Sequence, residues 1–395
     1  MLESRWFILA VLFAARFALG YQFQSAGSVG PFLIRDFGIG YTQVGLLVGG
    51  FLLPGIAISL PSGFLGRRFG DKTVVTFGLA LMVVGGLIAT LAQSYYAVLS
   101  GHLIAGVGGA ILIVLMSKMV VDWFADKELF LGNAIFIVGW PVGIAAGQAT
   151  QSWLAEATSW QFVFGASTVL VALALVLMAA FYHSPPDRRE AAVEVPERLT
   201  WSDIKIACLA GIIWMFLNGA YLVMLSFGPA HLVERGFPIA QASVLVSLMS
   251  WVFIFALPLG GYVATRYRAP NLVMVGGLAA SIVLGTLIPF APWPFVFFTL
   301  YGIALAIAAP VVGSLAAEVL NPRARGPGFG VYFLWYFGGM PVLIAFAGLL
   351  RDWTGSVTAS LLFANAMLAC GLVLAGFFRS VQGRRPLAAN ARPVP

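Results

Sequence analysis

Charged side chains are scarce in this chain. They make up 9% of its 395 residues, whereas about 25% is usual for soluble domains. A surface so poor in charge cannot face water on all sides, so the composition excludes an ordinary water-soluble fold. Hydrophobic residues make up 61%, and the chain is long enough for about a dozen membrane spans of roughly 20 residues each.

Cysteine is nearly absent, and so are the motifs of several enzyme classes. The two cysteines, Cys208 and Cys370, both lie in apolar runs, which excludes a disulfide framework and a cysteine metal site. The chain has no glycine-rich loop followed by lysine that would bind a nucleotide. The apolar segments bring no acids, histidines or nucleophile together at one depth. We therefore expect no metal, no cofactor and no enzymatic activity.

Twelve apolar segments fill most of the chain instead. They are expected at about residues 6–29, 42–64, 73–92, 97–120, 130–153, 161–182, 204–229, 241–264, 271–290, 294–317, 328–350 and 356–378. The one long polar interval, His183 to Asp203, separates two sets of six. We predict an all-α integral membrane protein with a six-helix bundle at 1–183, a cytoplasmic linker at 184–203, a second bundle at 204–378 and a disordered cytoplasmic tail at 379–395.

The positive charges are distributed unevenly about these segments. If the N-terminus is cytoplasmic, 18 of the 22 Lys and Arg residues fall inside, Arg35, Arg235 and Arg351 fall outside, and Arg16 lies within a span. Such asymmetry is typical of membrane proteins, whose cytoplasmic loops are basic. The net charge of +7 therefore indicates topology rather than nucleic-acid binding. We expect both termini in the cytoplasm and the chain in a plasma membrane, the inner membrane of a bacterium.

The two sets of six segments resemble each other. Three matches have offsets of about 198 to 200 residues: the segments that begin at Pro31 and Pro229, Gly63–Arg68 with Gly261–Arg266, and Gly139–Pro141 with Gly339–Pro341. They indicate an internal duplication. Parallel six-span repeats with a site at their interface are a transporter architecture.

The segment from Gly63 to Lys72, GFLGRRFGDK, resembles the signature of the major facilitator superfamily between spans two and three. The alternative is a generic tight loop. Arg67 stands where the family usually has an aspartate, and Asp71 supplies an acid nearby, while Asp122 is a candidate partner for the arginines. Glycines in so short a reversal are expected to allow close helix approach and free backbone angles. The signature residues are Gly63, Gly66, Arg67, Arg68, Gly70 and Asp71.

The resemblance implies that spans one, four, seven and ten line a central cavity. Arg16 lies about 15 Å into span one at 1.5 Å per residue, near the bilayer midplane. No acid lies at this depth, so we interpret Arg16 as a receptor for a substrate's negative charge; the alternative is an arginine that bonds carbonyls or snorkels. Phe23 shares its helix face. The duplication and spans ten and eleven add candidate binding residues: Trp214, Asn218, Tyr221, Tyr301, Tyr332, Trp335 and Tyr336. Aromatic residues at helical spacing also commonly pack cores.

His102 in span four replaces an arginine found in many members of the family. A histidine can relay protons near neutral pH, which makes His102 a candidate for proton coupling; a neutral histidine bonded to a carbonyl is the alternative.

Charges of opposite sign occupy equivalent positions in the two halves. Lys118 corresponds to Glu318, and Arg35 and Asp36 correspond approximately to Glu234 and Arg235. We hypothesise that these pairs latch the halves together, at the inner and outer sides respectively. The alternative is ordinary compensation of charge at helix ends.

The sequence thus predicts a monomeric secondary transporter that moves a small, anionic solute across the lipid bilayer by alternating access. A proton or a counter-anion is the expected coupling partner. An exporter of hydrophobic, drug-like compounds by proton antiport is the main alternative. A non-transporting membrane sensor and a membrane enzyme are weaker ones.

Overall fold

The computed structural model describes residues 4–124, 128–185, 199–320 and 325–384, and this part of the chain is helical, without strands. The helices are α1 (Arg5–Phe37), α2 (Tyr41–Gly50), α3 (Gly55–Phe69), α4 (Asp71–Thr90), α5 (Tyr95–Phe124), α6 (Leu129–Ala157), α7 (Trp160–Phe181), α8 (Trp201–Glu234), α9 (Ile239–Trp251), α10 (Phe253–Arg266), α11 (Pro270–Leu287), the short η1 (Ile288–Phe290), α12 (Pro294–Val319), α13 (Arg325–Thr354) and α14 (Val357–Arg384).

Twelve helical segments are long and apolar enough to cross a membrane, which confirms the predicted number of spans. Two of the spans are broken at matching places in the two halves. The second span consists of α2 and α3, which are separated by a turn at residues 51–54 that ends with Pro54, the N-cap of α3. The eighth span consists of α9 and α10, which are separated at Val252. The repeat seen in the sequence is therefore present in the fold.

Several helices extend past the predicted spans. Helix α3 continues to Phe69, so that only Gly70, at φ 85°, separates it from α4. Helix α8 begins at Trp201, and Thr200 caps it as predicted: its hydroxyl accepts from the Asp203 N–H at 3.2 Å. Helix α14 runs to Arg384, past the predicted start of a disordered tail at residue 379. Hydropathy identifies only the apolar part of a helix, whereas the backbone hydrogen bonds of these helices continue into the polar residues beyond it. Most of the predicted linker and tail, residues 186–198 and 385–395, lies outside the described residues.

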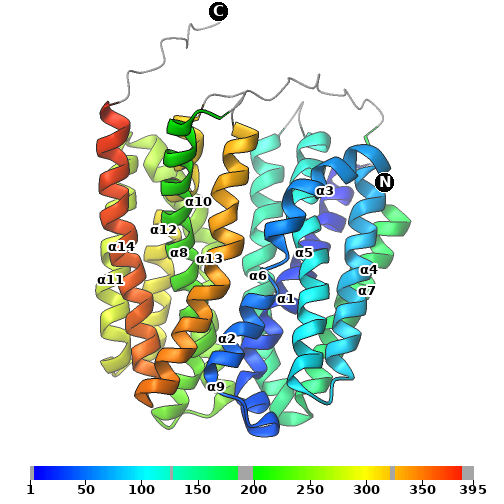
Figure 1. Ribbon diagram of the computed structural model, residues 1–395, viewed down its shortest axis with the longest axis vertical. Helices are drawn as coiled ribbons and strands as arrows, with labels where there is room; N and C mark the ends of the chain where they lie inside the picture. The colour runs from blue at the N-terminus through cyan, green and yellow to red at the C-terminus, as the bar shows by residue number, and fades with distance from the viewer. Residues whose placement is uncertain (1–3, 125–127, 186–198, 321–324, 385–395) are drawn as a thin grey trace, which may run out of the picture.

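The two halves, α1–α7 and α8–α14, stand side by side (Figure 1). The start of α1 and the end of α14 lie at one end of the molecule, here called the terminal end, and the opposite end is the distal end. At the distal end the halves pack closely through α2 with α13 and through α6 with α9, whereas α3 and α10 contact the opposite half only sparsely. The structure is therefore closed at its distal end.

Glycines allow the close approach of α2 to α13. A Cβ placed on Gly45 would lie 2.6 Å from the Ile344 carbonyl oxygen, and one on Gly49 would lie 2.6 Å from the Cα of Pro341. Because both obstacles are backbone, neither can move aside without a shift of the whole helix. Small residues at this contact let the two backbones approach each other, as in other membrane helix pairs.

We expect Gly45→Ala to lower the melting temperature of the purified protein, because overpacking costs about 1–3 kcal/mol. Gly63→Ala is the matched control, since a Cβ there meets nothing within 4 Å. Alanine also has the higher helix propensity, so the control should leave the melting temperature unchanged or raise it. If Gly45→Ala proved as stable as Gly63→Ala, the close contact of α2 with α13 would be contradicted.

Candidate substrate site between the two halves

Arg16 projects from α1 into an apolar environment. Its guanidinium carbon lies 4.5 Å from the centre of the Phe136 ring of α6, a distance suited to a cation–π contact. Gly139, also on α6, leaves room for the side chain, because a Cβ there would lie 3.3 Å from the Arg16 Cβ. Helix α6 thus supports the arginine from within the N-terminal half.

The polar atoms of Arg16 have no partner within the described residues. The Nε and Nη1 atoms are buried without a hydrogen bond, and no carboxylate forms an ion pair with the guanidinium in the described ranges. Arginine stays protonated at neutral pH, and a buried charge without a counter-ion is costly. The described structure therefore holds a positive charge without a protein counter-ion, and its neutralisation by a bound anion stays a prediction.

Aromatic side chains of α13 and α8 form a group in the C-terminal half, and one of them, Tyr336, lies near Arg16. Tyr336 is near enough to Arg16 for the two side chains to interact electrostatically, and Tyr332 lies one turn away on the same helix. Tyr332 stacks on Trp214 of α8, with ring centres 6.3 Å apart and planes 28° apart. The Tyr332 hydroxyl and the Trp214 Nε1 are buried without partners. The C-terminal half thus holds two buried hydrogen-bond donors without partners, joined to Arg16 through the position of Tyr336, and none of these residues is acidic.

The other predicted binding residues have partners within their own halves. Phe23 is 1% exposed and packs against Phe51 and Trp140, at 5.5 and 5.2 Å between ring centres. Asn218 donates to the Trp214 carbonyl at 2.9 Å. The Tyr221 hydroxyl is 2.8 Å from the Ser250 hydroxyl, although Tyr221 also lies near Tyr336.

Two further aromatic residues of the C-terminal half, Trp335 and Tyr301, have no described contact with Arg16. Trp335 lies between α13 and α8, where a Cβ on Gly211 would be 3.0 Å from its ring, and its Nε1 is buried without a partner. Tyr301 is fully buried in α12, and no contact described for it reaches Arg16. The structure therefore places Tyr336 near Arg16 and Trp214 against Tyr332, and the role of these residues in binding stays a prediction.

His102 lies inside the N-terminal half. It is 3% exposed, and its ring centre is 6.1 Å from that of Phe51 and 5.5 Å from that of Phe164. Its Nε2 is buried without a hydrogen bond, and the described contacts do not connect it to Arg16. A role in proton coupling stays a prediction.

The signature segment forms a helix end rather than a loop. Asp71 binds Lys118 of α5 at 2.7 Å, and Lys118 is also 4.0 Å from Asp122. Gly66 makes the Asp71 contact possible, because a Cβ there would lie 2.5 Å from Oδ1 of Asp71. The expected need for glycine is thus confirmed at Gly66, and at Gly70 by its positive φ. It is wrong for Gly63, which faces open space. Arg67 and Arg68 are exposed and lie over the rings of Phe64 and Phe69.

The hypothetical latch between Lys118 and Glu318 is not formed in this structure. Lys118 pairs with Asp71 of its own half, and Glu318 pairs with Arg379 and with Ser314, at 3.0 Å for the latter, in the other half. Each charge has a nearer partner, so neither needs to reach across.

The hypothetical outer latch is not formed either. Arg35 pairs with its neighbour Asp36 at 2.9 Å, and Asp36 also accepts from the Trp160 indole at 2.8 Å. Glu234 pairs with Arg351 at 3.7 Å, whereas Arg235 has no ion pair in the described ranges.

A polar contact that does cross the halves was missed by the sequence reasoning. It joins Asp352 at the distal end of α13 to the first residues of α2. Arg351 had been counted only as an outside charge, and Asp352 had not been considered. One feature of the sequence could have pointed to this contact. Arg351 and Asp352 are charged, whereas the residues that an offset of 200 aligns with them, Gln151 and Ser152, are uncharged.

Comparison with known proteins places this geometry in a family. The family model described as Major Facilitator Superfamily matches residues 12–241 and 209–394. A probable nitrate transporter of Staphylococcus epidermidis is 24% identical over 331 residues, which cover 80% of this chain and 82% of the relative. A hexuronate transporter of Bacillus subtilis is 22% identical over 415 residues, which cover 98% of each chain.

A solved structure gives the same result for the fold. A bacterial homologue of the human lysosomal transporter Spinster, in an inward-facing and occupied conformation, superposes with a TM-score of 0.79 at 15% identity, over 97% of this chain and 99% of that chain. At this identity the likeness concerns the fold alone. From the match of the family model along almost the whole sequence, the chain belongs to the Major Facilitator Superfamily and is a multi-pass membrane transporter rather than an enzyme.

Proposed function

We propose that this transporter moves a small anion and that Arg16 binds the negative charge of that anion between the two halves. The observation that carries the proposal is the buried guanidinium with unpartnered Nε and Nη1 atoms and no paired carboxylate within the described residues. Hydrogen bonds from a charged donor to an anionic acceptor are roughly twice as strong as neutral ones. An anion seated there offsets the cost of burying the arginine.

The neighbouring side chains suit an anion with a small apolar or planar body. The Trp214 Nε1 and the Tyr332 hydroxyl are free to donate, and the stacked rings offer an apolar wall. Both relatives described above have anions in their names, nitrate and hexuronate. At 22–24% identity they support the class of solute and do not identify it.

Transport then follows from the arrangement of the halves. Arg16 belongs to one half and Tyr336 to the other, so rocking the halves exposes the site to each side of the membrane in turn. With both termini in the cytoplasm, the closed distal end faces outward, and the structure represents a state closed to the outside. We place the transporter in a plasma membrane, the inner membrane in a bacterium. If the solute is exchanged for a counter-anion, no titratable group is needed. If transport is coupled to protons, His102 is the residue that would bind and release them.

Arg16→Gln is expected to weaken the binding of anions to the purified protein at least tenfold. A thermal-shift series with nitrate, glucuronate, neutral xylose and the cation tetraphenylphosphonium measures it. We expect the wild type to be stabilised by at least one of the anions, with an affinity at least tenfold higher than that of the variant, because a hydrogen bond to a charged group contributes about 1.5–3 kcal/mol. Arg16→Lys, which keeps the charge but loses the planar fork, should retain part of the effect. Stabilisation by anions that survives Arg16→Gln would defeat the proposal.

Trp214→Phe separates anion binding from binding of hydrophobic compounds. The substitution keeps an aromatic ring against Tyr332, but it removes the indole N–H together with the five-membered ring. For an anion we expect about a two- to tenfold weaker affinity in the same series, since one hydrogen bond contributes about 0.5–1.5 kcal/mol. The alternative, an exporter of drug-like compounds, draws support from the aromatic walls. It predicts that tetraphenylphosphonium or a neutral hydrophobic compound stabilises the protein and that Trp214→Phe leaves this effect unchanged.

A further inference from the structure

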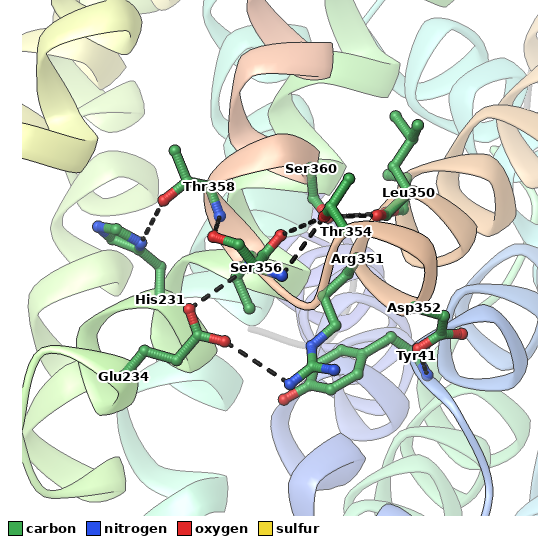
Figure 2. Close-up of polar contacts among 12 residues, drawn as sticks. Tyr41, His231, Glu234, Leu350, Arg351, Asp352, Thr354, Ser356, Thr358 and Ser360 are labelled. Carbon is green, nitrogen blue, oxygen red and sulfur yellow. Dashed lines mark hydrogen bonds and ion pairs between the residues drawn. The ribbon is translucent and has the colours of Figure 1, made fainter.

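A single carboxylate connects the two halves at the distal end. Asp352 lies near the end of α13, and its Oδ1 accepts from the backbone N–H of Tyr41 at 3.0 Å. Its Oδ2 accepts from the backbone N–H of Thr42 at 2.9 Å and from the Thr42 hydroxyl at 2.6 Å. Figure 2 shows Asp352 beside Tyr41, where α13 meets α2. Because Tyr41 and Thr42 are the first two residues of α2, Asp352 caps a helix of the opposite half.

Helix α2 depends on this cap for part of its first turn. The residue before it, Gly40, has no side chain that could accept from the free N–H groups at the start of α2. The Gln43 side chain accepts from the N–H of Gly40 itself, at 2.8 Å, and so leaves the N–H groups of Tyr41 and Thr42 to another acceptor. The first N–H groups of a helix have no intrahelical partner, and the positive end of the helix dipole favours an anion there. Asp352 satisfies both requirements.

Arg351 holds the end of α13 in place for this contact. Its guanidinium carbon lies 4.3 Å from the centre of the Tyr41 ring in the N-terminal half. On the other side it pairs with Glu234 at the end of α8, at 3.7 Å, and Glu234 also accepts from the Val357 N–H at 3.3 Å. Figure 2 shows the guanidinium between Tyr41 and Glu234. Arg351 therefore orients α13 toward α2 and links it to its own half.

The equivalent contact on the other side of the molecule carries no charge. The offset of 200 aligns Asp352 with Ser152 of α6, and Ser152 meets Ser243 of α9 through a hydroxyl hydrogen bond of 2.7 Å. Both contacts join the halves at the distal end, but only the one between α13 and α2 pairs an ionised group with a helix terminus. The two sides of the closure are therefore unequal.

We propose that Asp352 is the latch of the distal gate: its carboxylate caps α2 only while the halves are closed there, and it must leave α2 when they open. The latch is reversible, because Asp352 is exposed and Tyr41, Glu234 and Arg351 line a recess of about 300 Å³ beside it. Water can take over both the carboxylate and the helix N–H groups on opening. The position of the gate equilibrium thus depends on Asp352, whatever solute Arg16 binds.

The experiment measures opening of the distal end in the full-length protein. Cys208 and Cys370 are replaced by alanine, and spin labels are placed at the exposed distal positions Gln93 of the N-terminal half and Gln241 of the C-terminal half. Pulsed electron paramagnetic resonance on the protein in lipid nanodiscs then gives the distribution of distances between the labels. We expect Asp352→Ala to raise the ratio of open to closed distances on the order of tenfold, within the range that the loss of a helix cap produces.

Ser152→Ala is the matched control, since it removes the uncharged contact across the halves at the equivalent position. It should change the ratio less than about twofold, in keeping with a single neutral hydrogen bond. If Asp352→Ala does not yield folded protein, as judged by gel filtration, Asp352→Asn and Thr42→Val take its place. The first removes the charge and turns one accepting oxygen into an NH2 group, and the second removes only the hydroxyl donor, so both should shift the ratio toward open, by less than tenfold. An unchanged distance distribution in these Asp352 variants, or an equal shift with Ser152→Ala, overturns the proposal.

Discussion

The burial of one positive charge inside a bundle of apolar helices is the constraint that organises this transporter. A cation in such surroundings is costly unless it meets a partner or water. The described residues give Arg16 a ring contact with Phe136 but no anion. Its position between the halves means that whatever compensates the charge must lie at the surface along which they move against each other. We therefore propose that the charge of Arg16 couples substrate binding to the movement of the halves.

The number of spans could be predicted because it depends on the order of residues along the chain and not on how the helices pack. Hydropathy and the repeat at 198 to 200 residues are properties of consecutive residues, and they led to twelve spans in two halves. The isolation of Arg16 could be predicted for the same reason, since no acid occurs at a similar depth. The placement of Phe23 could not. Arg16 leaves α1 toward Phe136 of its own half and reaches Tyr336 through its long side chain, whereas Phe23, on the same face, fills the core.

The choice of partners among charged residues also required the structure. Equivalent positions with opposite signs suggested that Lys118 meets Glu318, but Asp71 and Arg379 are nearer and belong to the same halves. Distances across the interface depend on how the bundles pack, which the repeat alone does not determine. The role of Asp352 could not be predicted, because two of its three donors are backbone N–H groups of α2, which do not depend on the residue types. The signs of charges at equivalent span ends therefore do not identify the partners found in this structure.

The account assigns binding and gating to different places: Arg16 between the halves and Asp352 at the distal end. The first assignment is tested most directly by an experimental structure determined with a saturating anion, nitrate or glucuronate. The account predicts density for the anion within hydrogen-bonding distance of the Arg16 Nε or Nη1, with Trp214 or Tyr332 as a second donor. An anion bound elsewhere, with the Arg16 guanidinium still unpartnered, would contradict it.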